Sequence, residues 1–117
     1  MNKNYPEYYQ HLQSLMVKLG NELPGPMAGF GQLHRQAVAG GTLSTKVKEL
    51  IALGIAIAAR CDGCIAYHVH DALRAGATRK EVLEAIGVAI LMGGGPATVY
   101  GAEAFEALDQ FETAGTR

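Results

Sequence analysis

Two helical segments of this chain meet at a Cys-x-x-Cys motif with almost no linker between them. A segment from Thr45 to about Arg60 is followed at once by another from Asp62 to about Arg74, and Cys61-Asp62-Gly63-Cys64 spans the junction. We therefore expect a tight helix–helix corner with Cys61 at the turn. The unpaired N–H groups of the second helix then face the cysteines, and their partial positive charge favours a thiolate over a thiol.

The rest of the chain has helix start and stop signals and no strand alternation. We expect four further helices, near Pro6 to Leu19, Met27 to Val38, Thr78 to Gly93 and Pro96 to Phe111. Proline and glycine clusters separate them, and Thr78 with Glu81 forms a capping box. The sequence predicts one compact all-α domain of about six helices over residues 1–117, with a frayed tail at residues 112–117.

The composition limits the classes of partner. Hydrophobic residues make up 49% of the chain and charged residues 18%, which predicts apolar surface covered in a homo-oligomer, with residues 1–40 in the subunit contacts. The net charge of −1, without a basic run, argues against nucleic acid. The longest apolar stretch, Leu50 to Ala59, is shorter than the roughly 20 residues that span a bilayer. With a polar N-terminus and only two cysteines, we expect a cytoplasmic protein without a membrane contact.

His68 gives the cysteine pair a nearby base. Positions 64 and 68 are one turn apart on a helix, so the imidazole lies on the same face as Cys64 and leans back toward it. Cys61 is three residues from Cys64, within reach of a small reversible disulfide. A thiol with a base on its face and a second thiol to resolve it is typical of redox chemistry.

Glu49 is the candidate carboxylate for this base. It lies on the apolar stripe of the preceding helix, which carries it against the core, where His68 of the adjacent helix is a suitable partner. The alternative interpretation is an early-helix glutamate that complements the helix dipole and pairs with Lys46 or Lys48.

Two other interpretations of the cysteines remain open. They can be two small apolar residues packed side by side. They can also bind zinc together with His68, with Glu49 or His70 as a fourth ligand, although structural zinc sites usually join two ligand pairs and this chain has one. His70 faces away from His68 and is expected at a surface or an interface. We expect no metal and no cofactor.

The motif as a whole resembles a known family. Glu49, Cys61, Cys64 and His68 are similar to the Glu…Cys-x-x-Cys-x-x-x-His signature of the AhpD-like alkylhydroperoxidases, within the carboxymuconolactone decarboxylase superfamily. The resemblance covers roughly residues 43–107, including the corner Met92-Gly93-Gly94-Gly95-Pro96-Ala97. It implies an all-α fold that assembles as a homotrimer or a homohexamer.

The resemblance also implies roles for the four residues. Cys64 is then the peroxidatic thiol that attacks a small hydroperoxide, and Cys61 resolves the product to a disulfide. An external dithiol or a thioredoxin-like protein reduces that disulfide, and His68 with Glu49 forms a proton relay. The well-known peroxidase members have a second histidine just before the second cysteine, where this chain has Gly63.

Two functions of other classes stay as alternatives. One is a non-catalytic oligomeric module that senses redox state or binds a metal. The other is a decarboxylase-like enzyme that acts on a lactone with Glu49 and His68 as acid and base. The true lactone decarboxylases lack the cysteine pair, so its presence argues against that reaction.

Overall fold

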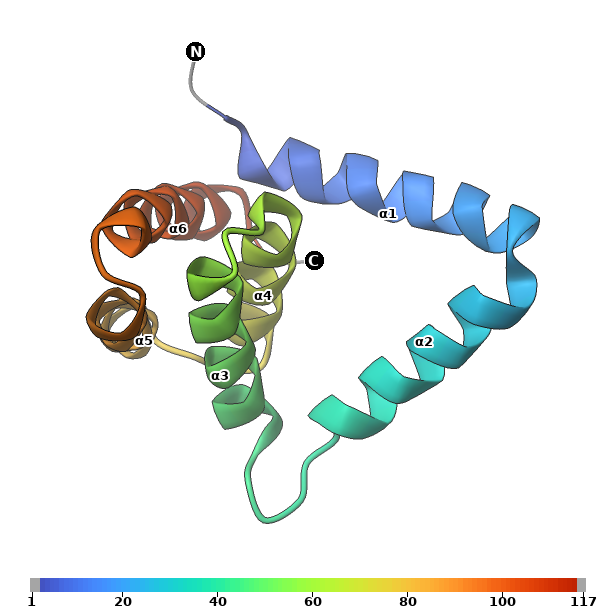
Figure 1. Ribbon diagram of the computed structural model, residues 1–117, viewed down its shortest axis with the longest axis horizontal. Coiled ribbons are helices and arrows are strands. Elements are labelled where there is room, and N and C mark those ends of the chain that lie inside the picture. The colour runs from blue at the N-terminus through green and yellow to red at the C-terminus, as the bar shows by residue number, and fades with distance from the viewer. Residues whose placement is uncertain (1–2, 116–117) are drawn as a thin grey trace.

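The computed structural model describes residues 3–115, which form six α-helices and no strand. The helices are α1 (Tyr5–Glu22), α2 (Pro24–Val38), α3 (Thr45–Ala58), α4 (Asp62–Arg74), α5 (Arg79–Gly93) and α6 (Gly95–Ala114). Figure 1 shows α3 to α6 gathered into a bundle, while α1 and α2 extend from it as a V-shaped arm. The predicted all-α class with about six helices is confirmed.

The bundle closes around one apolar core. In it α3 packs against α4 and α5, and α6 packs against the same two helices from the other side. The largest fully buried apolar side chains come from all four helices and from the start of α1: Tyr5, Leu53, Ile57, Ile65, Val69, Val82, Leu108 and Phe111. Within residues 3–115, no helix is long and apolar enough to cross a membrane.

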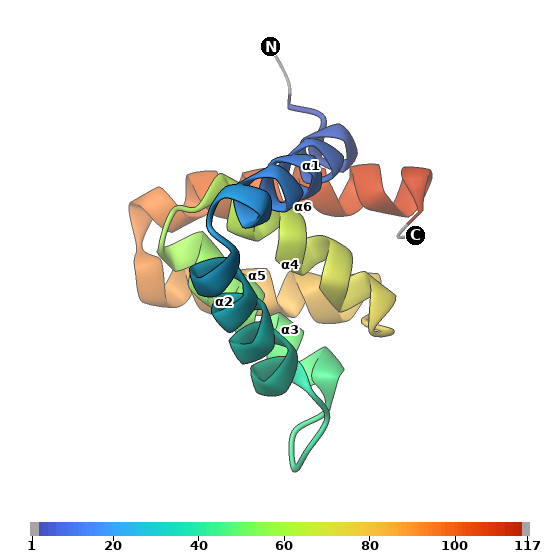
Figure 2. The same cartoon turned by 90° about the vertical axis from the view of Figure 1, so that its right-hand side faces the viewer.

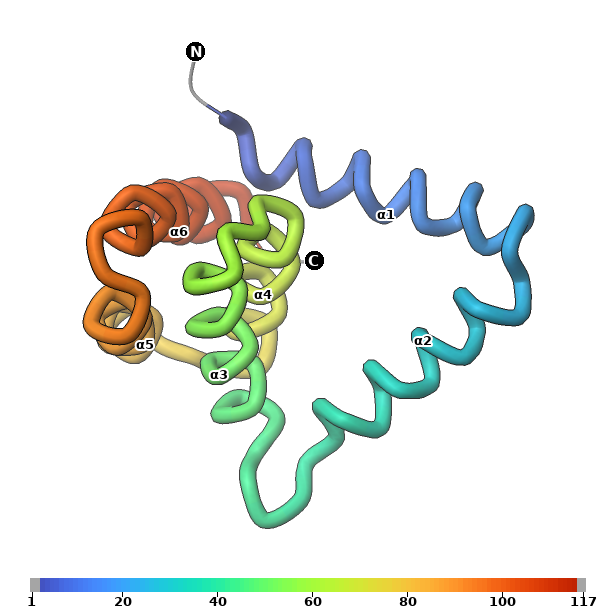
Figure 3. The backbone as a smooth tube through the Cα atoms, viewed as in Figure 1, coloured from blue at the N-terminus to red at the C-terminus, as the bar shows by residue number. Residues whose placement is uncertain are grey.

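The predicted corner between α3 and α4 is present. Figure 3 shows the backbone passing from α3 into α4 through a short turn. Arg60 adopts a left-handed conformation, with φ of 58°. Its N–H donates to the carbonyl of Ile57, and the N–H of Cys61 donates to the carbonyl of Ala56, both at 3.1 Å. These two bonds are the Schellman pattern that ends a helix, so Arg60 terminates α3 through its backbone and leaves Cys61 as the N-cap of α4.

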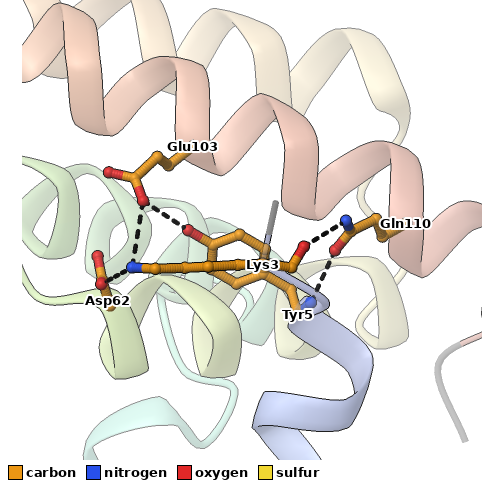
Figure 4. A network of polar contacts seen from close by, with 5 residues as sticks. All are labelled: Lys3, Tyr5, Asp62, Glu103 and Gln110. Carbon is orange, nitrogen blue, oxygen red and sulfur yellow. Dashed lines mark hydrogen bonds and ion pairs between the residues drawn. The ribbon is translucent and has the colours of Figure 1, made fainter. Parts of the chain in front are cut away.

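The start of α1 is fixed to α4 and α6 by a polar network (Figure 4). The Lys3 ammonium pairs with Asp62 and with Glu103, and the Lys3 carbonyl accepts a bond from the Gln110 amide at 2.7 Å. The Tyr5 backbone N–H donates to Gln110 at 2.7 Å, and its hydroxyl donates to Glu103 at 3.1 Å. Burial, and then the Glu103 charge, raise the pKa of Tyr5, which keeps this hydroxyl a donor.

The remainder of the arm lies away from the core. Helix α2 has no buried residue, and Figure 2 shows it in front of the bundle, on its outer side. Figure 1 shows that α2 approaches α3 only toward its C-terminal end. Large apolar side chains of the arm are exposed: Leu15, Met16, Val17, Leu19, Leu23, Phe30 and Leu33. This surface suits the subunit contacts expected of residues 1–40, which stay a prediction.

Several helix boundaries differ from the predicted ones, and α1 continues to Glu22, whereas we expected it to end near Leu19. Helix α2 begins at Pro24, whereas we expected it near Met27. Proline is accepted in the first turn of a helix because the N–H groups there have no intrahelical partner. Helix α6 continues to Ala114, so the expectation of a frayed tail is wrong for residues 112–114, and residues 116–117 lie outside the described part.

The corner between α5 and α6 requires a glycine at position 93. A Cβ there would lie 2.6 Å from the Ala97 Cβ, whereas a Cβ at Gly87, also in α5, has no neighbour within 4 Å. We expect Gly93→Ala to destabilise the fold by about 1–3 kcal/mol through overpacking. The matched Gly87→Ala should stabilise it by about 0.5–1 kcal/mol through helix propensity. Urea unfolding of both variants measures this difference, and equal effects would contradict the packing.

Candidate active site

The two cysteines form a disulfide at the N-terminus of α4. Cys61 and Cys64 are covalently joined, with their Cα atoms 5.2 Å apart. The backbone N–H of Cys64 also donates to the Cys61 sulfur at 3.2 Å, so this sulfur caps the helix. Both residues are partly exposed. The motif therefore lies where a small molecule or a second thiol can reach it, and it is in the oxidised state.

Glu49 is buried and bonded to His68. Only 3% of Glu49 is exposed, and its Oε1 lies 2.7 Å from the His68 Nδ1. The alternative partners are engaged elsewhere, because Lys46 pairs with Glu81 and Lys48 donates to a backbone carbonyl. A buried carboxylate needs such a partner, since leaving it unpaired in the core is costly. The predicted contact between Glu49 and His68 is present.

His68 and Cys64 lie one turn apart on α4. The described residues, 3–115, contain no hydrogen bond between the imidazole and either sulfur, although the two side chains are one turn apart. Because Nδ1 bonds to Glu49, Nε2 is the ring nitrogen that remains for proton exchange with a thiol. The constellation thus consists of a buried carboxylate, an imidazole fixed by it and a disulfide on the same helix face.

Helix α1 covers the position of Gly63. A Cβ added there would lie 3.0 Å from the Leu12 Cδ1 and 3.7 Å from the Tyr8 hydroxyl oxygen. A larger side chain at this position would therefore need the Leu12 side chain to shift. No local sequence pattern indicated that α1 borders the motif, because this contact depends on how the arm folds back.

Two residues that the sequence analysis did not single out lie beside Glu49. They are His34 and Asp71. A ring nitrogen of His34 and one carboxylate oxygen each of Glu49 and Asp71 all lie within 4.8 Å of one another. Asp71 Oδ1 is also 2.7 Å from the His70 Nδ1. His70 is 1% exposed and its ring stacks on Tyr9 with centroids 4.0 Å apart, so its expected place at a surface or interface is wrong.

Comparison with known proteins places these features in a family context. A family model described as the carboxymuconolactone decarboxylase family matches residues 24–107, beginning further toward the N-terminus than the expected residues 43–107. A crystal structure of a carboxymuconolactone decarboxylase family protein from Legionella pneumophila is similar over 92% of this chain and 96% of its own, with 40% identity and a TM-score of 0.88.

Two further relatives are more distant. A Thermotoga maritima protein of the same family, for which an involvement in antioxidative response has been suggested, has 29% identity and a TM-score of 0.71. That likeness covers 76% of this chain and 92% of the other. A protein of unassigned function from Cupriavidus necator is 38% identical over 91 residues, which is 78% of this chain and 80% of the relative.

The contact of Leu12 with Gly63 is testable by a double-mutant cycle. In the native background, the new methyl group of Gly63→Ala meets the Leu12 side chain, whereas in the Leu12→Ala background it has room. We expect Gly63→Ala to be less favourable by about 1 kcal/mol when Leu12 is present. Chemical unfolding of the four proteins measures this coupling. Effects that add within about 0.5 kcal/mol would show that α1 does not press on the motif.

Proposed function

The chain belongs to the carboxymuconolactone decarboxylase family, and we propose that it is a thiol-dependent peroxidase that reduces small hydroperoxides through Cys61 and Cys64. The observation that carries this proposal is the disulfide at the start of α4, on the same helix as an imidazole that a buried carboxylate orients. In this proposal the observed disulfide is the product of peroxide reduction. The two thiols supply the two electrons that reduce one hydroperoxide, so this step requires no cofactor.

The first step is attack by the Cys64 thiolate on one oxygen of the peroxide O–O bond. A sulfur–oxygen bond forms, the O–O bond breaks, and Cys64 becomes a sulfenic acid. The leaving alkoxide takes a proton from His68 and departs as an alcohol. Glu49 supports this transfer, because its bond to Nδ1 orients the ring and stabilises the imidazolium before the proton leaves.

The second step is attack by the Cys61 thiolate on the Cys64 sulfur. A disulfide forms and the hydroxyl leaves as water after taking a proton. Two thiols and one hydroperoxide thus give a disulfide, an alcohol and water. The position of Cys61 as N-cap supports this role, because the N–H of Cys64 and the helix dipole both stabilise a negative charge on the Cys61 sulfur.

The cycle then needs an electron donor from outside the chain. We propose an external dithiol or a thioredoxin-like protein that reduces the partly exposed disulfide by thiol–disulfide exchange. We also propose that the protein works as a homotrimer or homohexamer, and the exposed apolar side chains of the arm support this assembly.

A thiol count tests the proposed reaction directly. The reduced, metal-stripped protein receives one equivalent of an organic hydroperoxide, and free thiols are counted before and after. We expect both thiols to disappear within seconds and to return when a dithiol is added. Thiols that survive for many minutes would contradict peroxidase activity and favour a non-catalytic redox or metal-binding module.

Serine variants separate the roles of the two cysteines. We expect Cys64→Ser to abolish peroxide reduction, because the attacking sulfur is gone. Cys61→Ser should reduce about one equivalent of peroxide and stop at the Cys64 sulfenic acid, which a cyclic diketone reagent labels for mass spectrometry. Undiminished turnover in Cys64→Ser, or a sulfenic acid label on Cys61 in that variant at the wild-type rate, would falsify the assignment.

The relay is tested by the rate of disulfide formation. We expect His68→Ala to slow oxidation by hydroperoxide about 10²–10⁴-fold, the usual contribution of a general acid–base group, and Glu49→Gln to slow it less. His11 of α1 is exposed, so His11→Ala serves as the control with unchanged rate. Stopped-flow measurement of thiol loss gives the rates. A wild-type rate in His68→Ala would exclude His68 from proton transfer.

A further inference from the structure

We propose that His34, Glu49 and Asp71 bind a divalent first-row transition-metal cation, with Zn²⁺ as the representative ion. The three residues come from α2, α3 and α4, and they bring one ring nitrogen and two carboxylate oxygens within 4.8 Å of one another. Glu49 also belongs to the proposed relay with His68, whereas His34 and Asp71 lie outside the cysteine motif. The site differs from the zinc site of cysteines and His68 that the sequence left open, because it uses no sulfur ligand and shares only Glu49 with it.

The donor set suits such an ion. Imidazole nitrogen and carboxylate oxygen are both zinc ligands, and two carboxylates together balance a charge of +2. Zinc bonds of about 2.0–2.2 Å place tetrahedral ligand atoms roughly 3.4 Å apart. The ligand atoms are at most 4.8 Å apart in the structure. Small rotations of the side chains would shorten these distances to the value that zinc requires. Water can complete the coordination, as it does in zinc sites with three protein ligands.

Each carboxylate of the site also forms a hydrogen bond to a histidine that is not one of the three proposed ligands. His68 bonds to Glu49 Oε1 and His70 bonds to Asp71 Oδ1, both at 2.7 Å. A carboxylate has two oxygens, so each can keep its histidine and still bind a cation. The His70 ring is buried and stacked on Tyr9, which makes its support rigid. Hydrogen-bonded outer partners of this kind are typical of metal-binding carboxylates.

His34 approaches the two carboxylates from the outer helix α2. Helix α2 has no buried residue, and yet its His34 places an imidazole nitrogen within 4.8 Å of a carboxylate oxygen of Glu49 and of Asp71. A cation bound to His34, Glu49 and Asp71 would link α2 directly to the two central helices. Metal binding would thereby hold the arm against the bundle.

The experiment uses the disulfide form of the protein, in which Cys61 and Cys64 are joined to each other. Metal-free oxidised protein is titrated with Zn²⁺ by calorimetry, and with Co²⁺ as a spectroscopic probe. We expect about one ion per chain, with cobalt d–d absorption and no thiolate-to-cobalt charge-transfer band. Zinc should also raise the melting temperature of the oxidised protein.

Matched variants identify the ligands. We expect His34→Ala and Asp71→Asn each to weaken zinc binding by at least about 100-fold, while the exposed His11→Ala leaves it unchanged. His34 lies on a helix without buried residues, so its variant should keep the fold of the bundle. Equal affinity of wild type and His34→Ala would overturn the proposal. Binding that appears only after reduction, with thiolate bands, would overturn it in favour of a cysteine site.

These outcomes are independent of the proposed peroxidase activity. The thiol count follows the reduced protein and a hydroperoxide, whereas zinc binding is measured on the oxidised protein without substrate. The chain can therefore fail one test and pass the other.

Discussion

The contact between Glu49 and His68 depends on the abrupt reversal between α3 and α4. Arg60 ends α3 in a left-handed conformation, and α4 begins two residues later. The two helices must then run back along each other, which brings the first half of α3 beside the middle of α4. The carboxylate and the imidazole meet because they lie at comparable distances from this corner. A longer connection would leave a buried carboxylate without its partner, at a cost of several kcal/mol.

Local sequence signals predicted most of the bundle and the centre of the site. Thr78 and Glu81 do form a capping box, and Ser44 caps α3, because such caps depend on residues only three positions apart. The pairing of Glu49 with His68 was predictable for a related reason. Helical periodicity fixes the face of each residue, and the short corner fixes which helices are neighbours.

Contacts that depend on the arm could not be predicted in this way. His34 and Leu12 reach Glu49 and Gly63 only because α1 and α2 fold back toward α3 and α4. No periodicity encodes such a return, since it follows from distant interactions such as the network of Lys3 and Tyr5 at the far end of α1. The burial of His70 was missed because its neighbour Tyr9 belongs to the same arm.

The position of Cys61 as a helix cap joins secondary structure to redox state. The sulfur that accepts the N–H of Cys64 is neutral in the disulfide, and it becomes negatively charged when the bond is reduced and the thiol ionises. An anion at this position strengthens the cap, so the first turn of α4 is firmer in the reduced protein. The stronger cap stabilises only the reduced state. The free energy of this stabilisation therefore shifts the thiol–disulfide equilibrium toward reduction. In the proposed peroxidase cycle, the helix itself would contribute to returning the chain to its dithiol form after each oxidation.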